Sequence, residues 1–89
     1  MTVTVISAAT AIQELIALVD QFQLHKGISN SLLAKLASAS RSLDQWKEKP
    51  AKNKLNAFIN EVEAQAGKKI PEEQAAELIS MASRIVSSI

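Results

Sequence analysis

Residues 32–46 read LLAKLASASRSLDQW, and this stretch predicts a packed helix. Its apolar residues recur at steps of four and three, which aligns them along one side of a helix as a packing seam. Small residues between them allow another helix to approach closely. We therefore expect a central helix that runs to Lys49, because Pro50 disfavours helical backbone in the residue before it. The seam consists of Leu32, Leu36, Ala39, Leu43 and Trp46.

The sequence before this seam predicts a first helix over about residues 8–25. Ser7 and Thr10 are alternative N-caps for it. Gly27 is expected to adopt the left-handed conformation that ends the helix. Residues 29–31, Ser-Asn-Ser, would then cap the second helix. The apolar face of the first helix is Ile12, Leu15, Ile16, Val19 and Phe22.

Two further helices are predicted after Pro50. The third ends at Gly67, the residue type expected just beyond a helix. The fourth begins with Pro71 at its first helical position, followed by Glu72 and Glu73, which face the positive end of the helix dipole. The apolar faces are Leu55, Phe58, Ile59, Val62 and Ala66 in the third helix, and Ala75, Leu78, Ile79, Ala82, Ile85, Val86 and Ile89 in the fourth.

Length and composition favour an all-α fold with one core. The 89 residues are too few for two independent cores. Two Gly and two Pro are too few for a fold of many short strands and tight turns. The short connections predict four short antiparallel helices in an up-down-up-down bundle. A three-helix bundle with a docked fourth helix is the alternative.

Residues 1–7 differ in pattern from the rest of the chain. Their MTVTVI stretch alternates Thr with Val, which is typical of a strand. We interpret residues 1–7 as a residual strand or linker from a preceding domain, and residues 8–89 as the helical bundle module.

The composition argues against several classes of function. Ten Lys and Arg oppose nine Asp and Glu, so the net charge of +1 gives no general attraction to nucleic acid or anionic lipid. No apolar run approaches the roughly 20 residues that span a bilayer. The absence of cysteine excludes disulfides and thiolate ligands. No basic residue lies in residues 1–11, so any signal peptide is expected upstream.

No group of residues has the spacing of a catalytic or metal site. His25 is the sole histidine, and we expect it in the last turn of the first helix, where the dipole favours a partly cationic ring. Glu61 and Glu63 point to different sides of their helix. No Gly-x-Ser-x-Gly elbow or Asp-rich calcium loop occurs. We expect a non-enzyme with no catalytic, cofactor-binding or metal-binding residues and no cofactor.

The strongest local concentration of charge is a group of four lysines around the connection between the second and third helices. Its lysines suit a solvated turn at a helix C-terminus, which is the interpretation we favour. The alternative is a docking point for an anionic cell-wall polymer or a negatively charged partner domain. Trp46 beside it would stack on sugars if exposed, although its place in the seam favours burial. The candidate binding surface is Trp46, Lys47, Lys49, Lys52 and Lys54.

Four segments together resemble the FIMAH domain. They are IQELIALVDQF from Ile12, KGISNSLLAKL from Lys26, and KLNAFINEV from Lys54, followed by residues 70–79 with Gln-Ala-Ala at 74–76. The resemblance covers about residues 10–88. The FIVAR module is a similar helical domain and remains the close alternative.

This resemblance implies an accessory module of multidomain extracellular proteins from Gram-positive bacteria. It therefore implies secretion or display at the cell surface, and it brings no catalytic residues with it. We expect a non-catalytic spacer or protein-interaction module whose partner is a neighbouring domain of the parent protein or another protein. The alternative is a module that binds a carbohydrate or a cell-wall polymer. Neither hypothesis involves nucleic acid or a membrane span.

Overall fold

The computed structural model describes residues 8–89, which form four α-helices. These are α1 (Ala8–Gln21), α2 (Lys26–Asp44), α3 (Glu48–Gln65) and α4 (Glu72–Ser88). The predicted all-α fold is confirmed. The strand or linker predicted for residues 1–7 lies outside the described residues.

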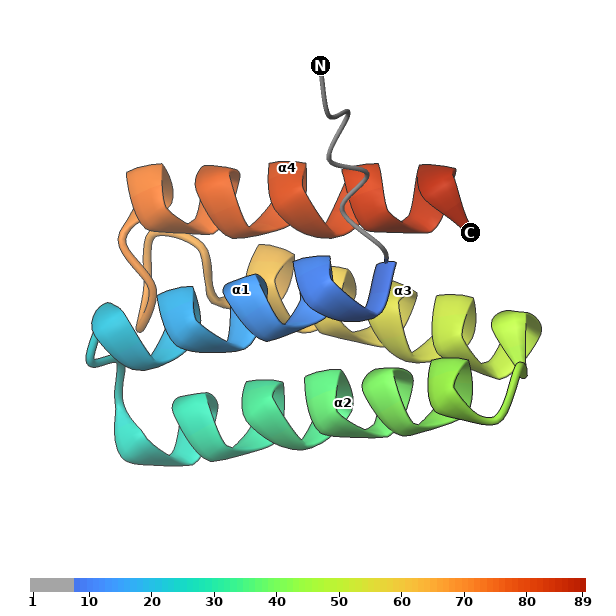
Figure 1. Cartoon of the computed structure of the whole chain (residues 1–89). Coiled ribbons are helices and arrows are strands. Elements are labelled where there is room, and N and C mark those ends of the chain that lie inside the picture. The colour runs from blue at the N-terminus through green and yellow to red at the C-terminus, as the bar shows by residue number, and fades with distance from the viewer. Residues whose placement is uncertain (1–7) are drawn as a thin grey trace, which may run out of the picture.

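The four helices form a closed ring of neighbours. Each helix packs against the next one in the chain, and α4 also packs against α1. Figure 1 shows consecutive helices running in opposite directions, which is consistent with the predicted up-down-up-down order. Because α4 contacts both α1 and α3, it is a full member of the bundle. The prediction that the second helix is central was wrong, since α2 packs against α1 and α3 but not against α4.

The core is built from one face of every helix. The buried residues recur at steps of three and four in each helix, as the 3.6-residue period of the α-helix requires. No polar or charged residue is buried within residues 8–89. The buried helical residues are Ile12, Leu15 and Val19 in α1; Ile28, Leu32, Leu36 and Ala39 in α2; Ala51, Leu55, Phe58 and Val62 in α3; and Ala75, Leu78, Ala82 and Ile85 in α4.

The α2–α3 pair is also joined by polar contacts at the edge of the core. Lys35 Nζ lies 2.8 Å from Glu61 Oε1, and the Ser31 hydroxyl donates a hydrogen bond of 2.8 Å to the same oxygen. The Lys35 and Glu61 side chains are 30% and 20% exposed, so water screens the pair less than a fully solvated one. These contacts add a polar link between α2 and α3 beside their apolar interface.

The connection between α1 and α2 differs from the prediction. Gly27 was expected to end the first helix, but it lies in the first turn of α2. His25 is the N-cap of α2, and its Nδ1 accepts a hydrogen bond of 3.2 Å from the Gly27 amide. His25 was expected in the last turn of the first helix, and residues 29–31 were expected to cap the second. Both predictions were wrong, because a histidine acceptor replaces the serine cap.

The two prolines mark helix starts rather than helix ends. Pro50 lies in the first turn of α3, where a backbone amide has no partner within the helix and the missing N–H costs little. Helix α2 therefore ends at Asp44, before the predicted Lys49. Pro71 precedes α4 as its N-cap rather than taking the first helical position.

The connection between α3 and α4 follows the prediction at Gly67. This glycine has a φ of +75° just beyond α3. Its amide donates a hydrogen bond of 2.8 Å to the Ile70 carbonyl, and the Ile70 amide donates one of 3.1 Å to the Gln65 carbonyl. The resulting turn buries Ile70 completely and leads directly into α4.

Candidate interaction surface at the α2–α3 turn

Helix α2 ends in a hydrogen-bond pattern that is usually built around glycine. The Lys47 amide donates a hydrogen bond of 2.8 Å to the Ser42 carbonyl, and the Trp46 amide donates one of 3.0 Å to the Leu43 carbonyl. These two bonds define a Schellman motif, in which the residue after the C-cap takes the left-handed conformation. Trp46 occupies that position with a φ of +59°. A bulky side chain is uncommon there because its Cβ crowds the backbone.

This backbone conformation explains where the indole ring lies. The left-handed residue breaks the helical period, so Trp46 no longer continues the seam of Leu36 and Leu43. Trp46 is 91% exposed, and it is the one large apolar side chain that is exposed in residues 8–89. The prediction that Trp46 is buried was wrong. The condition that the ring be exposed, which the carbohydrate hypothesis required, is met.

A shallow hollow of about 360 Å³ lies beside the ring. The N-terminus of α1 contributes small side chains, the end of α2 contributes Leu43 and a carboxylate, and the start of α3 contributes another carboxylate. Neither carboxylate has a hydrogen bond or an ion pair within the described part of the chain. The lining residues are Ala8, Ala9, Leu43, Asp44, Trp46 and Glu48.

The four lysines of the candidate surface lie next to this hollow but do not line it. Lys47, Lys49 and Lys54 are exposed, and Lys52 is half-buried. None of them forms an ion pair in residues 8–89. The corner between α2 and α3 therefore has an acidic hollow beside Trp46 and a separate group of solvated lysines.

Sequence reasoning missed the two acids at this corner. The available signal was Asp44, a carboxylate in the last turn of a helix, where the negative end of the dipole disfavours it. Glu48 gave no such signal, because an acid in the first turn of α3 is explained by the dipole alone.

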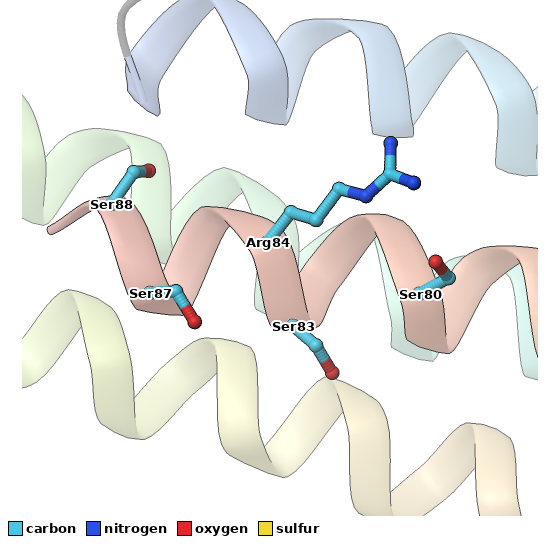
Figure 2. Close-up of a pocket in the computed structure, with 5 residues that line it drawn as sticks. All are labelled: Ser80, Ser83, Arg84, Ser87 and Ser88. Carbon is cyan, nitrogen blue, oxygen red and sulfur yellow. The ribbon is translucent and has the colours of Figure 1, made fainter.

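A second hollow, of about 430 Å³, lies along the exposed side of α4. Its lining residues are Ser80, Ser83, Arg84, Ser87 and Ser88. Figure 2 shows that these side chains diverge: Arg84 points toward one neighbouring helix, and Ser83 and Ser87 point toward the opposite side. The Ser88 hydroxyl donates a hydrogen bond of 2.9 Å to the Ile85 carbonyl of its own helix. The hydroxyls therefore do not converge on a common point, as a nucleophile and its base must.

Neither a metal site nor a membrane span is found in the described residues. Within residues 8–89, no three His, Cys, Asp or Glu side chains cluster closely enough to hold a metal ion. The histidine ring is used as a helix cap, as described above. No helix in this part of the chain has the length and apolar character needed to cross a bilayer.

Comparison with known proteins identifies the family. The FIMAH domain model matches residues 9–87, which include nearly all of the four helices. A search of curated proteins and a search of solved structures each found no match. The family match agrees with the sequence resemblance over almost the same residues. This chain therefore belongs to the FIMAH domain family.

Proposed function

We propose that this chain is a non-catalytic accessory module that contacts a protein partner, or a neighbouring domain of its parent protein, through the corner between α2 and α3. The observation that carries this proposal is the exposure of Trp46 on a left-handed backbone. Tryptophan is among the residues that dominate binding energy at protein interfaces.

Two energetic costs at Trp46 support a binding role over that of an inert spacer. The ring leaves a large apolar surface in water, which costs about 25 cal/mol for each Å². The left-handed backbone costs a residue with a Cβ about 1–2 kcal/mol. A glycine would avoid both costs while keeping the Schellman bonds. Locally unfavourable residues of this kind are often retained for function.

The proposal includes an extracellular setting for the parent protein, either secreted or displayed at a Gram-positive cell surface. It rests on the FIMAH family membership and on the expectation that such modules accompany extracellular domains. Fractionation of a producing strain would check it. Recovery of the parent protein only in the cytosolic fraction would contradict this part of the proposal.

Site-specific photocrosslinking in the parent protein tests the interaction role. A photoreactive amino acid at Lys47 should give discrete crosslinks to a partner protein or to another domain of the parent, identified by mass spectrometry. The same amino acid at Ser80, which is exposed on α4, is the matched control. The Lys47 crosslinks should disappear when Trp46→Gly is added. Equal crosslinking from both positions, or from the Trp46→Gly variant, would contradict the role of this corner.

The second candidate function is binding of an anionic cell-wall polymer or a polysaccharide. It is favoured by an exposed aromatic ring beside four lysines that have no ion-pair partner within residues 8–89. Its test is retention of the isolated chain on insoluble cell wall and on a polysaccharide panel at low and high salt. Retention should weaken with salt. It should be lost when Lys47, Lys49, Lys52 and Lys54 are all changed to Gln. Absence of retention on every support would reject this candidate.

A further inference from the structure

We propose that the hollow beside Trp46 binds the guanidinium group of an arginine side chain from the partner. This inference rests on the proposed protein-interaction function and specifies the chemistry of the partner at that site. It assigns a role to Asp44 and Glu48, which the candidate surface predicted from the sequence did not include.

The residues at the hollow supply two features that favour a guanidinium group, an aromatic ring and carboxylate acceptors. The Trp46 ring offers an aromatic face to which a cation is attracted. Asp44 and Glu48 supply carboxylate acceptors from two different helices, α2 and α3. Neither carboxylate is engaged by another group in the described residues, so no existing ion pair must be broken on binding.

The local electrostatics favour a cation despite the nearby lysines. Each helix end carries roughly half a charge, and the positive ends of α1 and α3 lie at this corner together with the negative end of α2. Two full negative charges on the lining carboxylates exceed the net positive contribution of these dipoles. The four lysines are absent from the lining, so the charged side chains that line the hollow are both negative.

Arginine fits this arrangement better than the other cations. Its planar group can stack on an indole while its N–H donors reach carboxylates to either side. A metal ion fits less well, because no three His, Cys, Asp or Glu side chains of residues 8–89 cluster closely enough to hold one. An anionic group would face both carboxylates at short range. The small side chains of Ala8 and Ala9 leave room for the arginine stem.

Backbone amide NMR of the chain tests this site with a defined probe, N-acetyl-arginine amide. Its neutral isostere, N-acetyl-citrulline amide, is the control ligand. The arginine probe should shift the resonances of residues 43–48 and of Ala8 and Ala9, and the citrulline probe should not. Asp44→Asn combined with Glu48→Gln should weaken arginine binding about tenfold or more, because two charged acceptors are lost. Lys52→Gln combined with Lys54→Gln should leave binding unchanged or strengthen it.

The outcomes separate this inference from the function on which it rests. Equal shifts with arginine and citrulline probes, shifts centred elsewhere on the bundle, or full binding by the Asp44 and Glu48 double variant would each overturn the arginine site. If Trp46-dependent crosslinks from Lys47 persist in that case, the interaction function stands without it. Arginine-specific shifts at the corner without Trp46-dependent crosslinks would support the cation site and reject the interaction function.

Discussion

At the scale of single residues, Trp46 is predicted to lower the stability of the fold. Trp46→Gly keeps the Schellman bonds and removes the Cβ from a left-handed residue, whereas Trp46→Ala retains that Cβ. We expect the Gly variant to be more stable than the Ala variant by about 1 kcal/mol. Thermal melts should show a difference in Tm of about 4–8 °C for this domain size. Equal melting of the two variants would show that the backbone at residue 46 is unstrained.

His25 provides the second prediction at this scale. Its Nδ1 accepts the Gly27 amide at the start of α2, so His25→Ala should destabilise the chain by about 1 kcal/mol. His25→Asp restores an acceptor and adds a negative charge at the positive end of the helix, so it should retain or exceed the parental stability. Chemical denaturation of the three proteins measures the order. If the Ala and Asp variants are equally stable, the cap contributes nothing.

These two residues show why some local features could not be predicted from the sequence. Gly27 and residues 29–31 matched the common stop and cap signals, so His25 was not considered as an N-cap. Trp46 matched the seam, and nothing in its identity indicates a left-handed backbone. In both places an uncommon residue type takes a role that glycine or serine usually fills.

At the scale of helices and connections, replacing each of the two glycines by alanine should change the stability of the chain in opposite directions. Gly67 has a φ of +75°, and an added Cβ would lie 3.0 Å from Glu72 Oε1. Gly67→Ala should therefore cost about 1–2 kcal/mol. Gly27 lies within α2, where an added Cβ meets only the His25 ring at 3.5 Å. Gly27→Ala should stabilise the chain by up to about 1 kcal/mol, because alanine favours helix.

Urea unfolding of both alanine variants and the parent checks this pair. The two substitutions add the same group, so each serves as the control for the other. Stabilisation at both sites would mean that the turn after α3 does not need a left-handed residue. Destabilisation at both would mean that Gly27 is not held as a helical residue.

Helix faces were predictable where helix ends were not. The apolar period repeats several times in each helix, so one misleading residue does not hide it, and the predicted faces pack in the core with the exception of Trp46. A helix end depends on one or two residues and on hydrogen bonds across a turn. For this reason the end of α3 at Gly67 was recognised, while the start and the end of α2 were each misplaced.

The acidic hollow could not be predicted from the sequence, because it is formed by residues of different helices that come together only in the folded chain. Ala8 and Ala9 come from one end of the chain, and Asp44 and Glu48 from its middle. Their proximity depends on α1 and α2 packing side by side, with α2 ending at Asp44. The predicted helix end at Lys49 would have placed Glu48 within the same helix as Asp44, and no hollow between elements would have been expected.

At the scale of the whole molecule, the apolar core should not tolerate a charge. Leu36 is completely buried, and no polar or charged residue is buried within residues 8–89, so a carboxylate at this position would have no partner in the core. Leu36→Asp should cost roughly 4 kcal/mol or more, a large part of the stability of a small domain. Ile59 is half-buried at the edge of the core, so the Ile59→Asp variant should lose less stability than Leu36→Asp and remain folded. Circular dichroism melts would show this order, and similar loss in both variants would mean that Ile59 is fully enclosed.

The unfolding of the whole bundle should be almost invisible to its single tryptophan. Trp46 is solvated in the folded chain, so its emission maximum should shift little on heating. Far-ultraviolet circular dichroism should report one cooperative transition, because the four helices share a single core. Iodide should quench Trp46 almost equally in the folded and unfolded states. A large red shift that coincides with the loss of helix would place the ring in the core instead, and both the interaction surface and the arginine site would then lose their central residue.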